Sequence, residues 1–83
     1  MTLFPVPEES RLDQLRPGER AVVQRIDGEP AIVRRLMELG LVPGTSVELV
    51  RRAPFGDPVE VRVRSTHLSI RRSEAERVHV EPA

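Results

Sequence analysis

Two histidines and one glutamate are the residues of this sequence that come closest to a metal site. His79 and Glu81 lie two positions apart, so they would share one face of a β-strand. His67 is the second histidine of the chain. Imidazole and carboxylate groups bind divalent cations, but a specific site takes three or four protein ligands. His67, His79 and Glu81 are therefore weak candidates, and we expect solvated side chains and no cofactor.

The chain offers no residues that predict catalysis. It has no cysteine to act as a nucleophile or as a thiolate ligand. It also lacks the glycine-rich Walker loop that cradles nucleotide phosphates. The sequence therefore predicts a protein that acts by binding a partner and is not an enzyme.

The charge balance argues against a nucleic-acid partner. Thirteen basic residues, all of them arginine, are matched by 13 acidic residues, which gives a formal net charge of zero. A protein that binds by neutralising phosphates would show a basic excess. The only aromatic residues are Phe4 and Phe55, too few for a platform on which bases stack.

A proline-bounded loop over residues 54–58 carries the most suggestive candidates for partner contact. Phe55 lies at the predicted tip of a hairpin, where an aromatic ring either folds back over the core or stays exposed as an anchor for a partner. Asp57 follows it between a glycine and a proline and is either a turn former or a contact residue. The sequence leaves both alternatives open.

Two leucines and three arginines complete the predicted docking surface. Leu39 and Leu41 fall at the end of the predicted helix, outside its buried stripe, so we expect them to be exposed. If the helix end and the 54–58 loop lie on one side, the charged rim of this patch is Arg34, Arg35 and Arg52.

One helix is predicted, over about residues 30–39. Pro30 suits the first helical position and Gly40 suits the stop. The apolar residues that fall at helical spacing, and that we expect to be buried, are Ile32, Val33, Leu36 and Met37.

Elsewhere the hydrophobic period is two, which predicts strands. Four segments are interpreted in this way: 46–53, 59–64, 67–71 and 78–81. Residues 20–26 are predicted as a further strand because they are rich in β-branched side chains. Leu12 and Leu15 allow one helical turn, and the capping-box spacing of Ser73 and Glu76 predicts a short helical turn near 73–76. Five short strands with tight turns favour a small, strongly bent SH3-like barrel, mostly β, with the helix inserted after the first strand.

Two segments carry a family resemblance. RLMELGLVPGT (residues 35–45) and APFGDPV (residues 53–59), in this order and spacing, closely resemble the FeoA family. The resemblance covers about residues 11–81. It implies an SH3-like barrel and an accessory role in bacterial ferrous-iron uptake, by direct contact with the cytoplasmic GTPase domain of the FeoB membrane permease. Ser65 departs from the family, whose members commonly have glycine at that turn.

Two alternative functions remain. One is the SH3-like regulatory domain of a metal-dependent repressor of the diphtheria-toxin-repressor type. That domain follows a DNA-binding helix-turn-helix, and we expect none here because the chain begins a few residues before the predicted barrel. The other is a small nucleic-acid-binding barrel, which the balanced charge disfavours. Weak self-association stays open.

The length predicts one domain over residues 11–83, preceded by a loosely ordered arm over 1–10. The longest apolar stretches are only four or five residues. Insertion into a membrane is therefore not expected, and the N-terminus lacks the features of a signal peptide. We expect a cytoplasmic protein.

Overall fold

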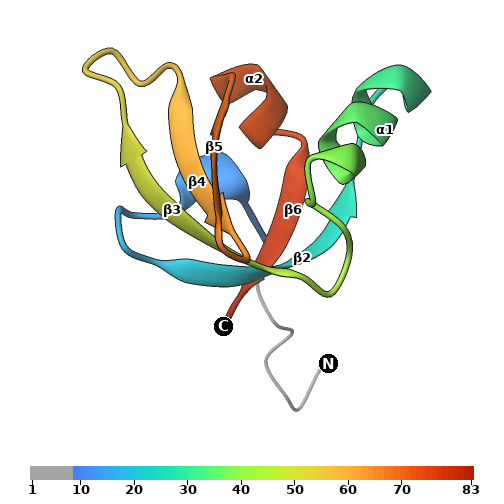
Figure 1. The fold of residues 1–83 in the computed structure, drawn as a ribbon, viewed down its shortest axis with the longest axis horizontal. Coiled ribbons are helices and arrows are strands. Elements are labelled where there is room, and N and C mark those ends of the chain that lie inside the picture. The colour runs from blue at the N-terminus through green and yellow to red at the C-terminus, as the bar shows by residue number, and fades with distance from the viewer. Residues whose placement is uncertain (1–8) are drawn as a thin grey trace, which may run out of the picture.

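The computed structural model describes residues 9–83, so the predicted arm lies almost wholly outside the described residues. Helix α1 and the strands occupy most of the described chain, and Figure 1 labels them. The elements in chain order are β1 (Ser10–Arg11), the 3₁₀ turn η1 (Leu12–Gln14), β2 (Arg20–Ile26), α1 (Pro30–Glu38), β3 (Ser46–Arg52), β4 (Val59–Val63), β5 (Thr66–Ile70), α2 (Arg72–Ala75) and β6 (Val78–Pro82).

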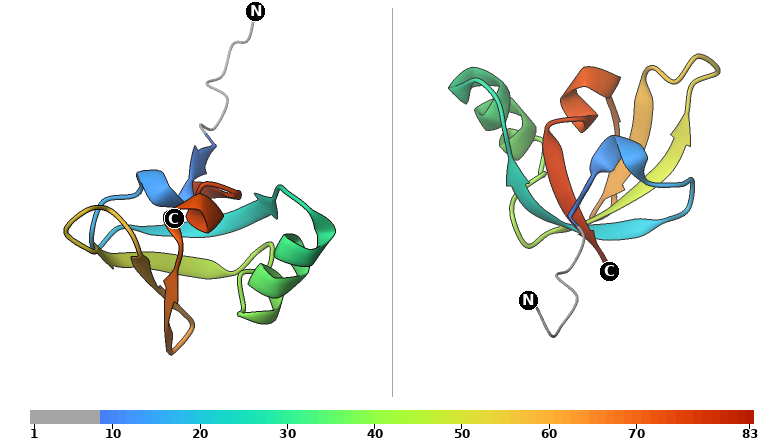
Figure 2. Two further views of the ribbon diagram at one scale, coloured as in Figure 1. Left: turned by 90° about the horizontal axis from the view of Figure 1, so that it is seen from above. Right: turned by 180° about the vertical axis from the view of Figure 1, so that it is seen from behind.

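All strands belong to one antiparallel sheet with the order β1-β6-β2-β3-β4-β5. The mostly β fold with one main helix is confirmed, and the five predicted strands are all present. The sheet has a sixth strand that the sequence did not predict, because β1 is only two residues long and pairs Ser10 with Val80. Figures 1 and 2 show that the sheet bends strongly on itself. Register shifts in β2 and β3 accompany the bend.

The core lies on the inner face of this bent sheet. Alternate residues of each long strand point inward, as a period of two requires. In β4, for example, Val59, Val61 and Val63 are buried, whereas Arg62 is exposed. The buried apolar residues of the other strands are Ala21, Val23, Val47, Leu49, Ile70, Val78 and Val80.

Helix α1 lies where the sequence predicts it, but its apolar stripe is less buried than expected. Only Leu36 is fully buried. Ile32 is partly buried and packs against the core, whereas Val33 and Met37 are half-exposed. The expectation that all four stripe residues are buried is therefore wrong, because Leu36 and Ile32 pack against the core whereas Val33 and Met37 line a shallow hollow that is open to solvent.

The end of α1 explains why Leu41 is a core residue. The Gly40 N–H donates to Met37 O at 2.9 Å, and the Leu41 N–H donates to Leu36 O at 3.1 Å. These two bonds form a Schellman motif, which needs the positive φ of Gly40, here 109°. The motif turns Leu41 back against Leu36, and both side chains are fully buried. The expectation that Leu41 is exposed is wrong.

Two short helical turns cover the ends of the sheet. The predicted turn near 73–76 is α2, although Ser73 does not cap it: the Arg71 N–H donates to Glu74 Oε1 at 2.8 Å. The turn η1 places Leu12 and, just after it, Leu15 in the core. Within residues 9–83, no helix is long and apolar enough to span a membrane.

The two leucines at the end of α1 provide a matched test of this packing. Leu41→Ala should lower the free energy of unfolding by about 2–5 kcal/mol, because it leaves a cavity beside Leu36. Leu39→Ala removes the same atoms from a side chain that is 38% exposed, so its cost should stay below about 1 kcal/mol. Chemical denaturation of both variants measures the difference, and equal costs would contradict the assigned packing.

Candidate functional site

Phe55 is the most prominent apolar group on the described surface. Its side chain is 96% exposed at the tip of the β3–β4 loop. The alternative in which the ring folds back over the core is therefore wrong for this structure. An exposed aromatic ring has no role in the protein's own packing, whereas aromatic rings are enriched among the anchors of protein interfaces.

The loop that carries Phe55 is held by hydrogen bonds. The Gly56 N–H donates to Ala53 O at 2.7 Å, and the Ala53 N–H donates to Pro58 O at 3.0 Å. Asp57 Oδ1 accepts a bond from the Arg72 N–H at 3.1 Å, which ties the loop to the start of α2. Asp57 thus has a structural partner, and Phe55 is presented on a loop that needs little ordering to bind.

The three arginines of the predicted rim make different contacts in the structure. The Arg52 guanidinium donates to the backbone oxygens of Asp13 and Leu15 and so fastens η1 to β3. Arg35 Nη1 lies 2.7 Å from Glu74 Oε2 and joins α1 to α2. Arg34 is exposed and lies beside Val33 and Met37 at a shallow apolar hollow.

The single patch predicted from the sequence is not assembled. Leu41 is buried, and α2 lies between α1 and the 54–58 loop in all three views (Figures 1 and 2). Leu39, which directly follows α1, and Phe55, in the 54–58 loop, therefore lie on opposite sides of α2.

The weak metal candidates do not come together. His67 is on β5, where its Nε2 accepts a hydrogen bond from Arg62 Nε at 3.0 Å. His79 and Glu81 are on β6, which the sheet order separates from β5 by three strands. Among residues 9–83 there is no group of three histidine, aspartate or glutamate side chains arranged to hold a metal ion.

His79 instead joins a cluster of charged groups at the end of β2, where β2 pairs with β6. Its Nε2 lies 2.5 Å from Asp27 Oδ2, and its Nδ1 lies 3.4 Å from Glu9 Oε1. Arg25 bridges the same two carboxylates, with Nη1 2.7 Å from Asp27 and Nη2 2.9 Å from Glu9. Hydrogen bonds from His79 and then Arg25 lower the pKa of Asp27 from its ordinary value.

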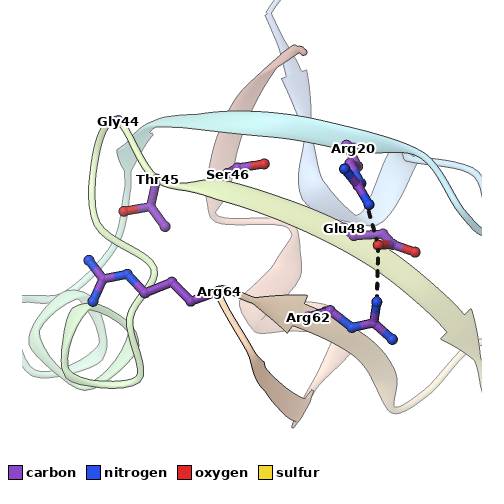
Figure 3. Close-up of a pocket in the computed structure, with 7 residues that line it drawn as sticks. All are labelled: Arg20, Gly44, Thr45, Ser46, Glu48, Arg62 and Arg64. Carbon is purple, nitrogen blue, oxygen red and sulfur yellow. Dashed lines mark ion pairs between the residues drawn. The ribbon is translucent and has the colours of Figure 1, made fainter.

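Sequence reasoning missed a polar hollow on the outer face of β2, β3 and β4. Figure 3 shows it lined by three arginines, one glutamate and two hydroxyl side chains. Its volume is about 540 Å³, and its lining residues are Arg20, Gly44, Thr45, Ser46, Glu48, Arg62 and Arg64. The strand alternation predicted charged outer faces, but only the register shows which charges meet.

These features define a class: a small SH3-like β domain whose exposed aromatic tip and charged outer face suit contact with another protein. The FeoA domain family matches residues 10–82 of the chain. The chain therefore belongs to the FeoA family, whose members are accessory proteins and not enzymes.

Solved structures agree with this assignment. The solution structure of FeoA from Chlorobium tepidum is 45% identical, with a TM-score of 0.83, over 88% of this chain and 70% of that one. FeoA from Stenotrophomonas maltophilia, crystallised with zinc and described as a prokaryotic SH3 domain protein, is 40% identical, with a TM-score of 0.75, over 86% and 88%. The SH3-like architecture predicted from the sequence is thereby confirmed.

A curated relative from Porphyromonas gingivalis places a similar sequence in a longer chain. It is described as a fusion of Fe(2+) transport protein A with the Fe(2+) transporter FeoB, and it is 37% identical over 71 residues. The match covers 86% of this chain but spans only 8% of that relative.

The cluster around Asp27 gives a testable pH dependence. Because the pKa of Asp27 is lowered in the folded state, its stabilising effect is present above the unfolded pKa and is lost as the pH falls through the folded pKa. His79→Ala should raise the pKa of Asp27 more than Arg25→Ala does, because the His79 bond is the largest cause. Side-chain carboxyl NMR titration checks this, and an unchanged Asp27 titration in His79→Ala would contradict the assigned bond.

Proposed function

We propose that this chain is an accessory protein of ferrous-iron uptake that acts by direct contact with the cytoplasmic GTPase part of a FeoB-type permease. The observation that carries the proposal is the Porphyromonas gingivalis relative, in which a similar domain and FeoB are parts of one polypeptide. Covalent joining raises the effective concentration of one module at the other, which is useful when the two work in contact. The proposal places the chain in the cytoplasm.

The surface around Phe55 supports this mode of action. A large exposed ring on a short loop loses little entropy on binding, because the loop is already tied by Asp57 and by its own backbone hydrogen bonds. Interface anchors are commonly aromatic residues that enter a pocket of the partner. Leu39, which directly follows α1 and is 38% exposed, offers a second apolar contact on the other side of α2.

An ion pair and a hydrogen bond link the segments that lie on the two sides of α2. Arg35 bridges α1 to Glu74 of α2, and the backbone of α2 donates to Asp57 of the loop. The three segments that would face a partner are thus linked to one another before binding. A preformed surface is favourable for a regulatory contact, because binding energy is not spent on ordering it.

Substituting Phe55 tests the anchor directly. Phe55→Ala should weaken binding to the cytoplasmic domain of the FeoB protein from the same organism by about 1–3 kcal/mol, a typical value for an anchor. Because the ring is exposed, the free energy of unfolding should change by less than about 0.5 kcal/mol. Isothermal titration calorimetry and chemical denaturation on the same variant measure both quantities.

Arg77→Ala is the matched control for this experiment. Arg77 is also exposed, but its side chain lies against Gly28 in the turn between β2 and α1, so its loss should leave binding through the 54–58 loop unchanged. If Phe55→Ala bound the cytoplasmic domain of FeoB with unaltered affinity, this would contradict the assignment of Phe55 as an interface anchor. A loss of about 3–5 kcal/mol in stability would show instead that the ring packs in the core.

A further inference from the structure

A ladder of charged side chains crosses the outer face of the sheet. The strand register pairs Arg20 with Glu48, Glu48 with Arg62, and Arg62 with His67, so that β2, β3, β4 and β5 each contribute one member. Glu48 is the only acidic residue in this row. It lies 3.6 Å from Arg20 Nε and 3.7 Å from Arg62 Nη1, longer than a hydrogen bond. One carboxylate therefore serves two guanidinium groups, and neither contact is close.

A third arginine extends this charge along the hollow. Arg64 follows the end of β4, and Figure 3 shows its side chain reaching past Thr45 toward the Gly44 turn, away from Arg62. It forms no ion pair with any residue in the range 9–83. The hollow thus has a cationic group at one end and two at the other, with the hydroxyls of Thr45 and Ser46 between them.

The backbone at Arg64 is strained. Arg64 has a φ of 58°, the only positive φ of a non-glycine residue in the described chain. The left-handed region disfavours residues with a Cβ, and glycine or asparagine would adopt it at less cost. The family position at which glycine was expected is Ser65, but the residue that needs positive φ here is Arg64. An arginine in a strained turn beside a hollow lined by two other arginines indicates a use for its charge.

The charges and hydrogen-bond donors of the hollow limit the chemical class of ligand that it can bind. Three arginines and one glutamate leave two uncompensated positive charges, so the ligand is anionic. The backbone N–H groups of Gly44 and Thr45 at its rim already donate to Val23 O and Val42 O. These two groups therefore offer no nest of free backbone donors to a phosphate. Planar guanidinium groups that are spread apart, as Arg64 is from Arg62 and Arg20, suit carboxylates that are spaced along an extended chain.

We propose that this hollow binds the glutamate or aspartate side chains of an extended acidic segment of a partner protein. The Arg20–Arg62 end takes one carboxylate in competition with Glu48, and Arg64 takes a second. The surface is distinct from that of Phe55, because it lies at the opposite end of the β3–β4 hairpin. This proposal does not depend on whether the partner is a FeoB-type permease.

A blocked octapeptide of alternating glutamate and serine is the probe, titrated into the ¹⁵N-labelled full chain. Saturable amide shifts are expected in residues 44–48 and 62–65, and they should weaken as salt is raised. The same peptide with glutamine in place of glutamate should give no shifts there. Sodium phosphate and a thymidine oligonucleotide are the competing probes, and tighter binding of either one at these amides would overturn the proposal, as would no response to the acidic peptide.

Four variants separate binding from a merely structural ladder. Arg62→Gln and Arg64→Asn should each weaken peptide binding about threefold to tenfold, the loss of one exposed charge-assisted contact. Asparagine tolerates positive φ, so Arg64→Asn keeps the turn. Arg77→Gln, which removes one exposed arginine elsewhere, should leave binding unchanged.

Glu48→Gln gives the sharpest outcome. It removes the competing carboxylate, so it should tighten peptide binding about threefold or more, even though it breaks the ladder. If the ladder served only the stability of the sheet, Glu48→Gln would lower the denaturation midpoint and leave peptide binding absent or unchanged. That result overturns the proposal, and the amide spectrum of each variant verifies that it is folded.

Discussion

The structure depends on one constraint, which is that a single sheet must enclose its own core. No disulfide is available, and strand pairing and packing hold the chain together. Alternation along β2, β3, β4 and β6 sends valine and leucine inward, and the bend of the sheet brings these inner faces together. The same alternation sends every second residue outward. The charged outer face is therefore a direct consequence of the core and not a separate design.

The open ends of this sheet are closed by short helical segments and secured by side chains. Leu36 and Leu41 close one end through the Schellman motif of α1. Arg52 secures η1 through backbone oxygens, and Glu74 joins α1 to α2 through Arg35. Arginine suits these ties because its guanidinium group donates several hydrogen bonds at once. Two of the arginines that the sequence suggests for a docking rim are thus occupied within the fold.

One hairpin, formed by β3 and β4, carries both surfaces that we assign to binding. The β3–β4 hairpin presents Phe55 at its loop and, at its other end, the hollow beside Arg62 and Arg64. A partner that engages both would contact the domain along the length of this hairpin. Paired strands hold Arg62 in place, and hydrogen bonds hold the loop that carries Phe55, so such contacts cost little in entropy.

The sequence by itself determined the elements, because periods of two and 3.6 and the Pro30 and Gly40 signals are local properties of the chain. It also determined the family, through the segments 35–45 and 53–59. Only the tertiary structure decided the strand register, which assembles Arg20, Glu48 and Arg62 from three strands. It likewise decided that Leu41 is buried and Phe55 exposed. The exposure of a side chain and its contacts depend on which distant segments pack together. The spacing of residues along the chain does not specify this packing.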